Sequence, residues 1–114
     1  MTDLIADWPD DADGGVLRRL AEHGFDFSKS WSVDFDVDFV QWPPCTEAVE
    51  LLRSMYGKVT LYPPGEGDVG HVQFQVVVRV SYESVTSIQR RTSAAMRALG
   101  GKCECWGILH GGAA

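Results

Sequence analysis

The stretch from Ser30 to Val40 constrains the fold of this chain most, because apolar and polar residues alternate along it without a break. A period of two is typical of a β-strand that turns one face to a core and the other to solvent. The apolar positions are Trp31, Val33, Phe35, Val37 and Phe39. The polar positions between them are Ser32, Asp34, Asp36 and Asp38. We therefore predict a half-buried strand whose polar face carries a row of carboxylates about 7 Å apart, at a rise of roughly 3.3 Å per residue.

The rest of the chain supplies three more strand patterns and three helix patterns. Residues 71–81 repeat the alternation, and shorter strands are expected at 58–62 and 102–109. Helical periodicity predicts helices from Val16 to His23 behind an Asp-rich start, from Cys45 or Thr46 to a stop at Gly57, and over residues 83–99. The predicted inward residues of the strands at 58–62 and 71–81 are Val59, Leu61, Val72, Phe74, Val76, Val78 and Val80.

This order is one helix followed by two β-α-β units. With right-handed crossovers it predicts an α/β (α+β) ferredoxin-like split β-α-β sandwich. Such a fold has a four-stranded antiparallel sheet with two helices on one face, here preceded by an extra N-terminal helix. The first and third strands are then central. The pattern leaves open whether the N-terminal helix covers the other face of the sheet.

Strict alternation also predicts which side chains share the face away from the helices. The expected set is Asp34, Asp36, Asp38, Gln73, Gln75, Arg79, Glu104, Trp106 and Ile108. Cys103, Cys105, Gly107 and Leu109 are expected to point inward. Trp106 would then be partly exposed and able to anchor a partner. The alternative is that the first helix or the N-terminal arm folds over it, since tryptophan is highly buried on average.

Length and charge narrow the class of protein. The 114 residues suit one domain over 1–114, with a loose acidic arm at 1–10 and a frayed tail at 110–114. A net charge of −6 disfavours direct nucleic-acid binding and suits a basic protein surface. We expect a cytoplasmic protein with reduced thiols, because the cysteine count is odd and neither a signal peptide nor a membrane span is visible.

The row Asp34, Asp36, Asp38 has three interpretations. It is a solvated strand face, a contact surface for a protein, or part of a divalent-metal site, although the sequence places no fourth ligand. Cys103 and Cys105 near His110 lack the paired spacing of structural zinc sites. Cys45 at a helix start has no base placed beside it. We expect no catalytic residues, no metal and no cofactor.

Several segments resemble the RraB family, the regulators of ribonuclease E activity. They are the run from Asp13 to Glu22, the connector from Asp26 to Lys29, the Phe-rich strand after it, and Cys105-Trp106-Gly107. The resemblance extends from about Asp7 to Leu109. In the family the last strand usually reads Tyr-Asp-Gly-Trp-Gly, whereas here it reads Cys103-Glu104-Cys105-Trp106-Gly107.

The resemblance implies a ferredoxin-like, non-enzymatic protein that binds a ribonuclease E-like endoribonuclease and modulates its RNA cleavage by inhibition. Our hypothesis for the partner-binding residues is Asp34, Asp36, Asp38, Glu104 and Trp106. Two alternatives stay open: an acidic interaction module with an unrelated partner, and a small divalent-metal-binding domain that uses the aspartate row. The oligomeric state is not set by the pattern.

Overall fold

A computed structural model describes residues 8–108 of the chain. The elements in order are α2 (Ala12–Glu22), β1 (Ser30–Phe39), α3 (Thr46–Tyr56), β2 (Val59–Tyr62), β3 (Gly70–Arg79), α4 (Tyr82–Met96), the short 3-10 helix η1 (Arg97–Leu99) and β4 (Gly101–Ile108). Most of the expected loose arm at 1–10 and the expected tail at 110–114 lie outside the described residues. No helix within 8–108 is long and apolar enough to cross a membrane.

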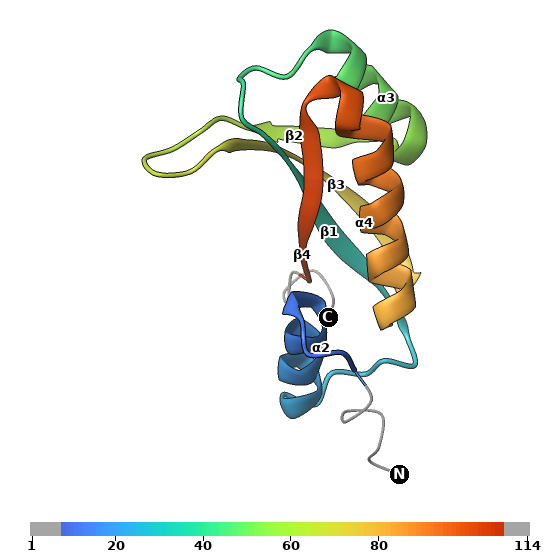
Figure 1. The fold of residues 1–114 in the computed structure, drawn as a ribbon. Coiled ribbons are helices and arrows are strands. Elements are labelled where there is room, and N and C mark those ends of the chain that lie inside the picture. The colour runs from blue at the N-terminus through green and yellow to red at the C-terminus, as the bar shows by residue number, and fades with distance from the viewer. Residues whose placement is uncertain (1–7, 109–114) are drawn as a thin grey trace.

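The four strands form one antiparallel sheet in the order β2-β3-β1-β4. The first and third strands are central, as predicted, and the order is that of the ferredoxin-like fold. Figure 1 shows α4 running alongside the sheet, with α3 near one end and α2 near the other. The predicted fold class is therefore confirmed.

The core lies between the sheet and the helices α3 and α4, and β1 is its centre. Phe35 is fully buried and stacks on Phe74 of β3, with ring centroids 5.4 Å apart. Tyr56 of α3 stacks on the same Phe74 at 3.9 Å. Leu17 of α2 is also fully buried, so the extra helix joins this core. Burial of this apolar face drives folding, because each large side chain removed from water contributes roughly 1.5–3 kcal/mol.

The helix boundaries follow local capping. Asp11 caps α2 by accepting a hydrogen bond from the Gly14 amide, so the helix begins four residues before the predicted Val16. Ser81 and Ser84 cap α4 reciprocally. In β2 the expected burial of Leu61 is wrong: its side chain is 39% exposed, because it lies near the end of this short edge strand.

A register break in β4 overturns the predicted faces of the last strand. Cys105 pairs with Asp36 and Cys103 pairs with Val37, so Glu104 is an extra residue with no partner on β1. Such a bulge reverses the alternation, since a shift of one residue exchanges the two faces. Cys103 is buried, as expected.

The residues after the bulge lie on the faces opposite to the prediction. Trp106 pairs with Phe35 and is only 7% exposed, and Ile108 pairs with Val33. Cys105 is exposed on the other face of the sheet, opposite Asp36. The predictions that Trp106 and Ile108 face away from the helices and that Cys105 faces inward are therefore wrong.

Candidate functional site

The acidic row, defined as Asp34, Asp36 and Asp38, lies on the sheet face away from the helices. Each carboxylate has a polar residue of β3 directly opposite in the antiparallel register: Gln75, Gln73 and His71, respectively. Gln75 Nε2 donates to Asp34 Oδ1 at 2.7 Å, and Gln73 Nε2 donates to Asp36 Oδ1 at 3.1 Å. These bonds hold the first two carboxylates in fixed orientations.

This face, which we call the open face, is accessible. Ser32 and Gln75 are exposed and Val77 is 73% exposed, so no described element packs over them. In Figure 1, α2 lies beyond the end of β4 rather than over the sheet. The acidic row itself is half-buried by its neighbours. The structure thus answers the question left open by the sequence: α2 leaves the row uncovered.

Asp36 and Asp38 form the more crowded end of the row. His71 Nε2 lies 3.8 Å from Asp36 Oδ1, and the His71 ring stacks on Tyr62 with centroids 4.9 Å apart. Burial raises the pKa of Asp38 above its ordinary value, and the charges of Asp36 and Glu104 raise it further, while His71 opposes them. Asp38 therefore carries its negative charge at an energetic cost, mainly because it is partly buried.

Glu104 lies near the row, as predicted, although it does so as the bulged residue. Its side chain is exposed and its Oε2 lies 3.2 Å from Lys102 Nζ. Lys102 pairs with Asp38 across the strands. Cys105 and His71 also join the open face, and their positions depend on the bulge and on the strand register.

Trp106 does not join this site. Its Nε1 donates a 2.8 Å hydrogen bond to Asp13 Oδ1 in the first turn of α2. The alternative considered for this residue, a covering first helix, is the arrangement observed. Trp106 is only 7% exposed and therefore has little surface left for a partner.

Within residues 8–108, no group of three or more His, Cys, Asp or Glu side chains is arranged to hold a metal ion. His110, the third residue of the zinc hypothesis, lies outside the described residues. Burial raises the pKa of the Cys103 thiol to about 12, with Asp36 and Asp38 adding to the effect. Cys45 is exposed at the start of α3 and makes no capping hydrogen bond with its side chain.

Comparison with known proteins gives one finding. A family model described as regulator of ribonuclease activity B matches residues 10–108 of the chain. No curated protein and no solved structure matches the chain significantly. The match covers nearly the whole sequence, including α2, the acidic row and β4. The chain therefore belongs to the RraB family, the regulators of ribonuclease activity B.

Proposed function

We propose that this protein binds a ribonuclease E-like endoribonuclease through the open face of its sheet and inhibits cleavage of RNA. The observation that carries the proposal is the acidic row, whose three carboxylates lie side by side on a face that no described element covers. Membership of a family of ribonuclease regulators supports a protein partner of this class. In this proposal the chain is not an enzyme, needs no cofactor and acts in the cytoplasm.

Charge complementarity supports this choice of partner. An endoribonuclease that holds RNA presents Lys and Arg side chains to the phosphates. A protein of net charge −6 with a negative row is attracted to such a surface and is repelled by RNA itself. Occupying part of that basic surface would reduce access of RNA to it, which is a direct route to inhibition.

The hydrogen bonds of the row also favour a binding role. Because Gln73 and Gln75 already orient Asp36 and Asp34, those carboxylates lose little freedom when a partner docks. Glu104 adds one further exposed carboxylate at the β4 side of the row. The interface we propose therefore comprises Asp34, Asp36, Asp38 and Glu104.

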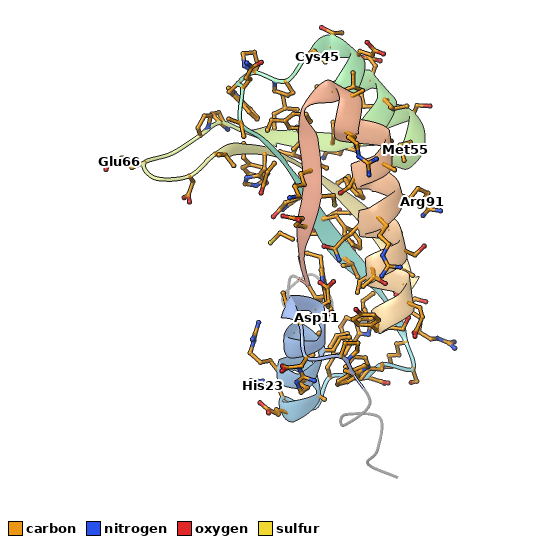
Figure 2. All side chains as sticks on the ribbon, viewed as in Figure 1. Asp11, His23, Cys45, Met55, Glu66 and Arg91 are labelled. Atoms are coloured by element: carbon orange, nitrogen blue, oxygen red, sulfur yellow. The ribbon has the colours of Figure 1, made fainter. Side chains whose placement is uncertain are left out.

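The test is the association rate with a purified ribonuclease E-like enzyme at low and moderate salt. The row variant is Asp34→Asn/Asp36→Asn/Asp38→Asn, and the charge-matched control is Asp10→Asn/Glu66→Gln/Asp68→Asn, whose positions are exposed and off the open face. Figure 2 shows Glu66 at the tip of the β2–β3 hairpin, far from the sheet. The row variant should associate about tenfold more slowly or worse, with a weaker salt dependence, while the control stays within about twofold of wild type.

Equal on-rates and salt slopes for wild type and the row variant would remove the row from the interface. Equal losses in both variants would show only an effect of net charge. If the wild-type protein binds no such enzyme but binds another protein with a basic surface, the proposal is wrong. The chain is then an acidic interaction module with an unrelated partner. Circular dichroism of each variant confirms that it is folded.

A further inference from the structure

A groove of about 850 Å³ lies between α4, the first turn of α2 and the start of β4. Its volume is in the range of sites that hold small ligands or short peptides. It shares no residue with the acidic row. Its charged lining residues are Asp11, Asp13, Arg90, Arg97, Lys102 and Glu104.

The two aspartates of the groove are committed to internal hydrogen bonds. Asp11 accepts from the Gly14 amide at 2.8 Å and from the Tyr82 hydroxyl at 2.7 Å. Asp13 accepts from the Trp106 indole and from the Gln89 side-chain amide. The acceptors on this side of the groove therefore serve to hold α2 against α4 and β4.

The two arginines are not committed in this way. Arg90 and Arg97 are exposed, and neither forms an ion pair or a side-chain hydrogen bond with any residue in 8–108. Arg90 lies in α4 and Arg97 is the first residue of η1, which continues the helical backbone. The two residues are seven positions apart, so they lie on one side of this helical segment. At roughly 1.5 Å of rise per residue, the two positions are separated by about 10 Å.

The wall that carries the arginines is fixed to the sheet. Ser93, which lies between Arg90 and Arg97 in the sequence, accepts from the Cys103 amide at 2.9 Å and donates to the Cys103 carbonyl at 3.1 Å. These bonds tie α4 to the edge of β4 and occupy the backbone groups of Cys103. The helical backbone beneath the arginines is therefore fixed, and a ligand could not pair with the strand at Cys103.

We propose that this groove binds an extended acidic segment of a protein, with two carboxylates about 10 Å apart placed on Arg90 and Arg97. In a peptide with a polyproline II backbone, acidic residues three positions apart lie on one side and have about this spacing, at roughly 3.1 Å per residue. A nucleic-acid strand fits less well, because its closely spaced phosphates would also approach Asp11, Asp13 and Glu104. A peptide with two isolated carboxylates would instead place neutral residues beside these acidic side chains. This surface shares Glu104 with the proposed ribonuclease interface but none of Asp34, Asp36 and Asp38, and it would attract an acidic rather than a basic ligand.

The test begins with selection of a random dodecapeptide library on the full chain. Selected peptides should be enriched in Asp and Glu three positions apart. Replacing those acids by Asn and Gln should weaken binding by about tenfold or more, since charge-assisted bonds are lost. The variant Arg90→Gln/Arg97→Gln should show a similar loss in fluorescence anisotropy titrations with the selected peptide.

The matched control is Arg91→Gln/Lys58→Gln, which removes the same charge outside the groove. Figure 2 shows the Arg91 side chain extending away from the body of the protein on α4. This control should bind the peptide within about twofold of wild type, because remote exposed charges are largely screened. Glu104→Gln should tighten binding, because it releases Lys102 from its 3.2 Å ion pair and removes a like charge.

Three outcomes would overturn the proposal. They are a selection without enrichment in Asp and Glu, equal binding of the selected peptide and its Asn/Gln-substituted form, and equal losses of peptide affinity in Arg90→Gln/Arg97→Gln and Arg91→Gln/Lys58→Gln. A single-stranded dodecauridylate forms the other arm of the experiment. If it binds more tightly than the peptide and depends on Arg90 and Arg97, the ligand is a nucleic acid and the protein segment is rejected. The acidic-row variant should bind the peptide like wild type, so failure here is distinct from failure of the proposed function.

Discussion

The indole Nε1 of Trp106 in β4 donates a 2.8 Å hydrogen bond to Oδ1 of Asp13 in α2, across 93 positions of the chain. The Gln89 side-chain amide of α4 also donates to this carboxylate. The helix opening at Asp13-Gly14 and the Trp106-Gly107 of the last strand both belong to the segments that resemble the RraB family. They meet in space, and their contact attaches α2 to the sheet and to α4.

The first prediction concerns the energy of this contact. Asp13→Ala and Trp106→Phe should each lower the free energy of unfolding by about 1–3 kcal/mol. The first leaves the buried Trp106 indole N–H without its acceptor, and the second removes one of the two side chains that donate to Asp13. In a double-mutant cycle their effects should be non-additive by about 1 kcal/mol or more. Urea unfolding followed by circular dichroism measures all three variants. The control cycle combines Asp10→Ala with Trp106→Phe, and the two changes in the free energy of unfolding should add. If the effects of Asp13→Ala and Trp106→Phe also add, the hydrogen bond does not stabilise the fold.

The second prediction compares two adjacent glycines of α2. A Cβ on Gly14 would collide with the Pro9 carbonyl oxygen, which also accepts a hydrogen bond from Arg18. A Cβ on Gly15 would meet only Arg19 Nη1, at 3.9 Å. Gly14→Ala should therefore destabilise the protein, whereas Gly15→Ala should stabilise it by about 0.5–1 kcal/mol through the better helix propensity of alanine. Thermal melts of the two variants decide this. Equal shifts in the same direction would mean that the segment before α2 does not pack as described.

The alternation along β1 and β3 was sufficient to predict the fold and the acidic row. Val33, Phe35 and Val37 are all fully buried, as their spacing requires. The three carboxylates of the acidic row share the opposite face for the same reason. A strand whose two faces differ so strongly has only one register that buries the apolar side, so local pattern and tertiary structure agree.

The faces of β4 could not be predicted in this way. Nothing in Cys103-Glu104-Cys105 marks Glu104 as an extra residue, because neither glycine nor proline is present there. The bulge allows both Cys103 and Trp106 to point into the core, a requirement that arises from packing against distant residues. The pairing of His71 with Asp38 likewise depends on the register between strands that are far apart in the sequence.

The third prediction uses the cysteines to test the bulge. Cys45 and Cys105 are exposed, whereas Cys103 is buried and its pKa is raised to about 12. Burial and the charges of Asp36 and Asp38 also raise the pKa of Cys105. Because the thiolate is the reactive form, iodoacetamide at mildly alkaline pH should label Cys45 first, Cys105 more slowly and Cys103 only on unfolding. Peptide mapping by mass spectrometry gives the three rates.

A pair of variants sharpens this measurement. Asp36→Asn should accelerate the labelling of Cys105, because Asp36 lies opposite it and disfavours the thiolate. Asp34→Asn should have a smaller effect, since Asp34 lies opposite Gly107. Labelling of Cys103 in the folded protein as fast as that of Cys45 would contradict the assigned faces of β4.

The last prediction concerns the pH dependence of stability at Asp38. Burial is the largest cause of its raised pKa, followed in the same direction by Asp36 and Glu104. A carboxyl whose pKa is higher in the folded state than in the unfolded state binds its proton more tightly when folded. Wild type therefore loses stability as the pH rises from near the ordinary value of 3.8 through the raised pKa, and the loss stays constant above it. Asp38→Asn removes this loss.

Asp38→Asn should thus leave stability almost unchanged at pH 3 and increase it at pH 7, by less than about 1 kcal/mol because a half-exposed charge is screened by solvent. Urea unfolding of wild type and variant across this range measures the difference, with the exposed Asp68→Asn as a control that should stay within about 0.5 kcal/mol of wild type. Most of the gain should persist in high salt, because salt screens Asp36 and Glu104 but does not reverse burial. A gain that disappears in salt would instead make repulsion along the acidic row the dominant cause. A variant less stable than wild type at pH 7 would mean that ionised Asp38 is stabilised, most directly by His71 opposite it.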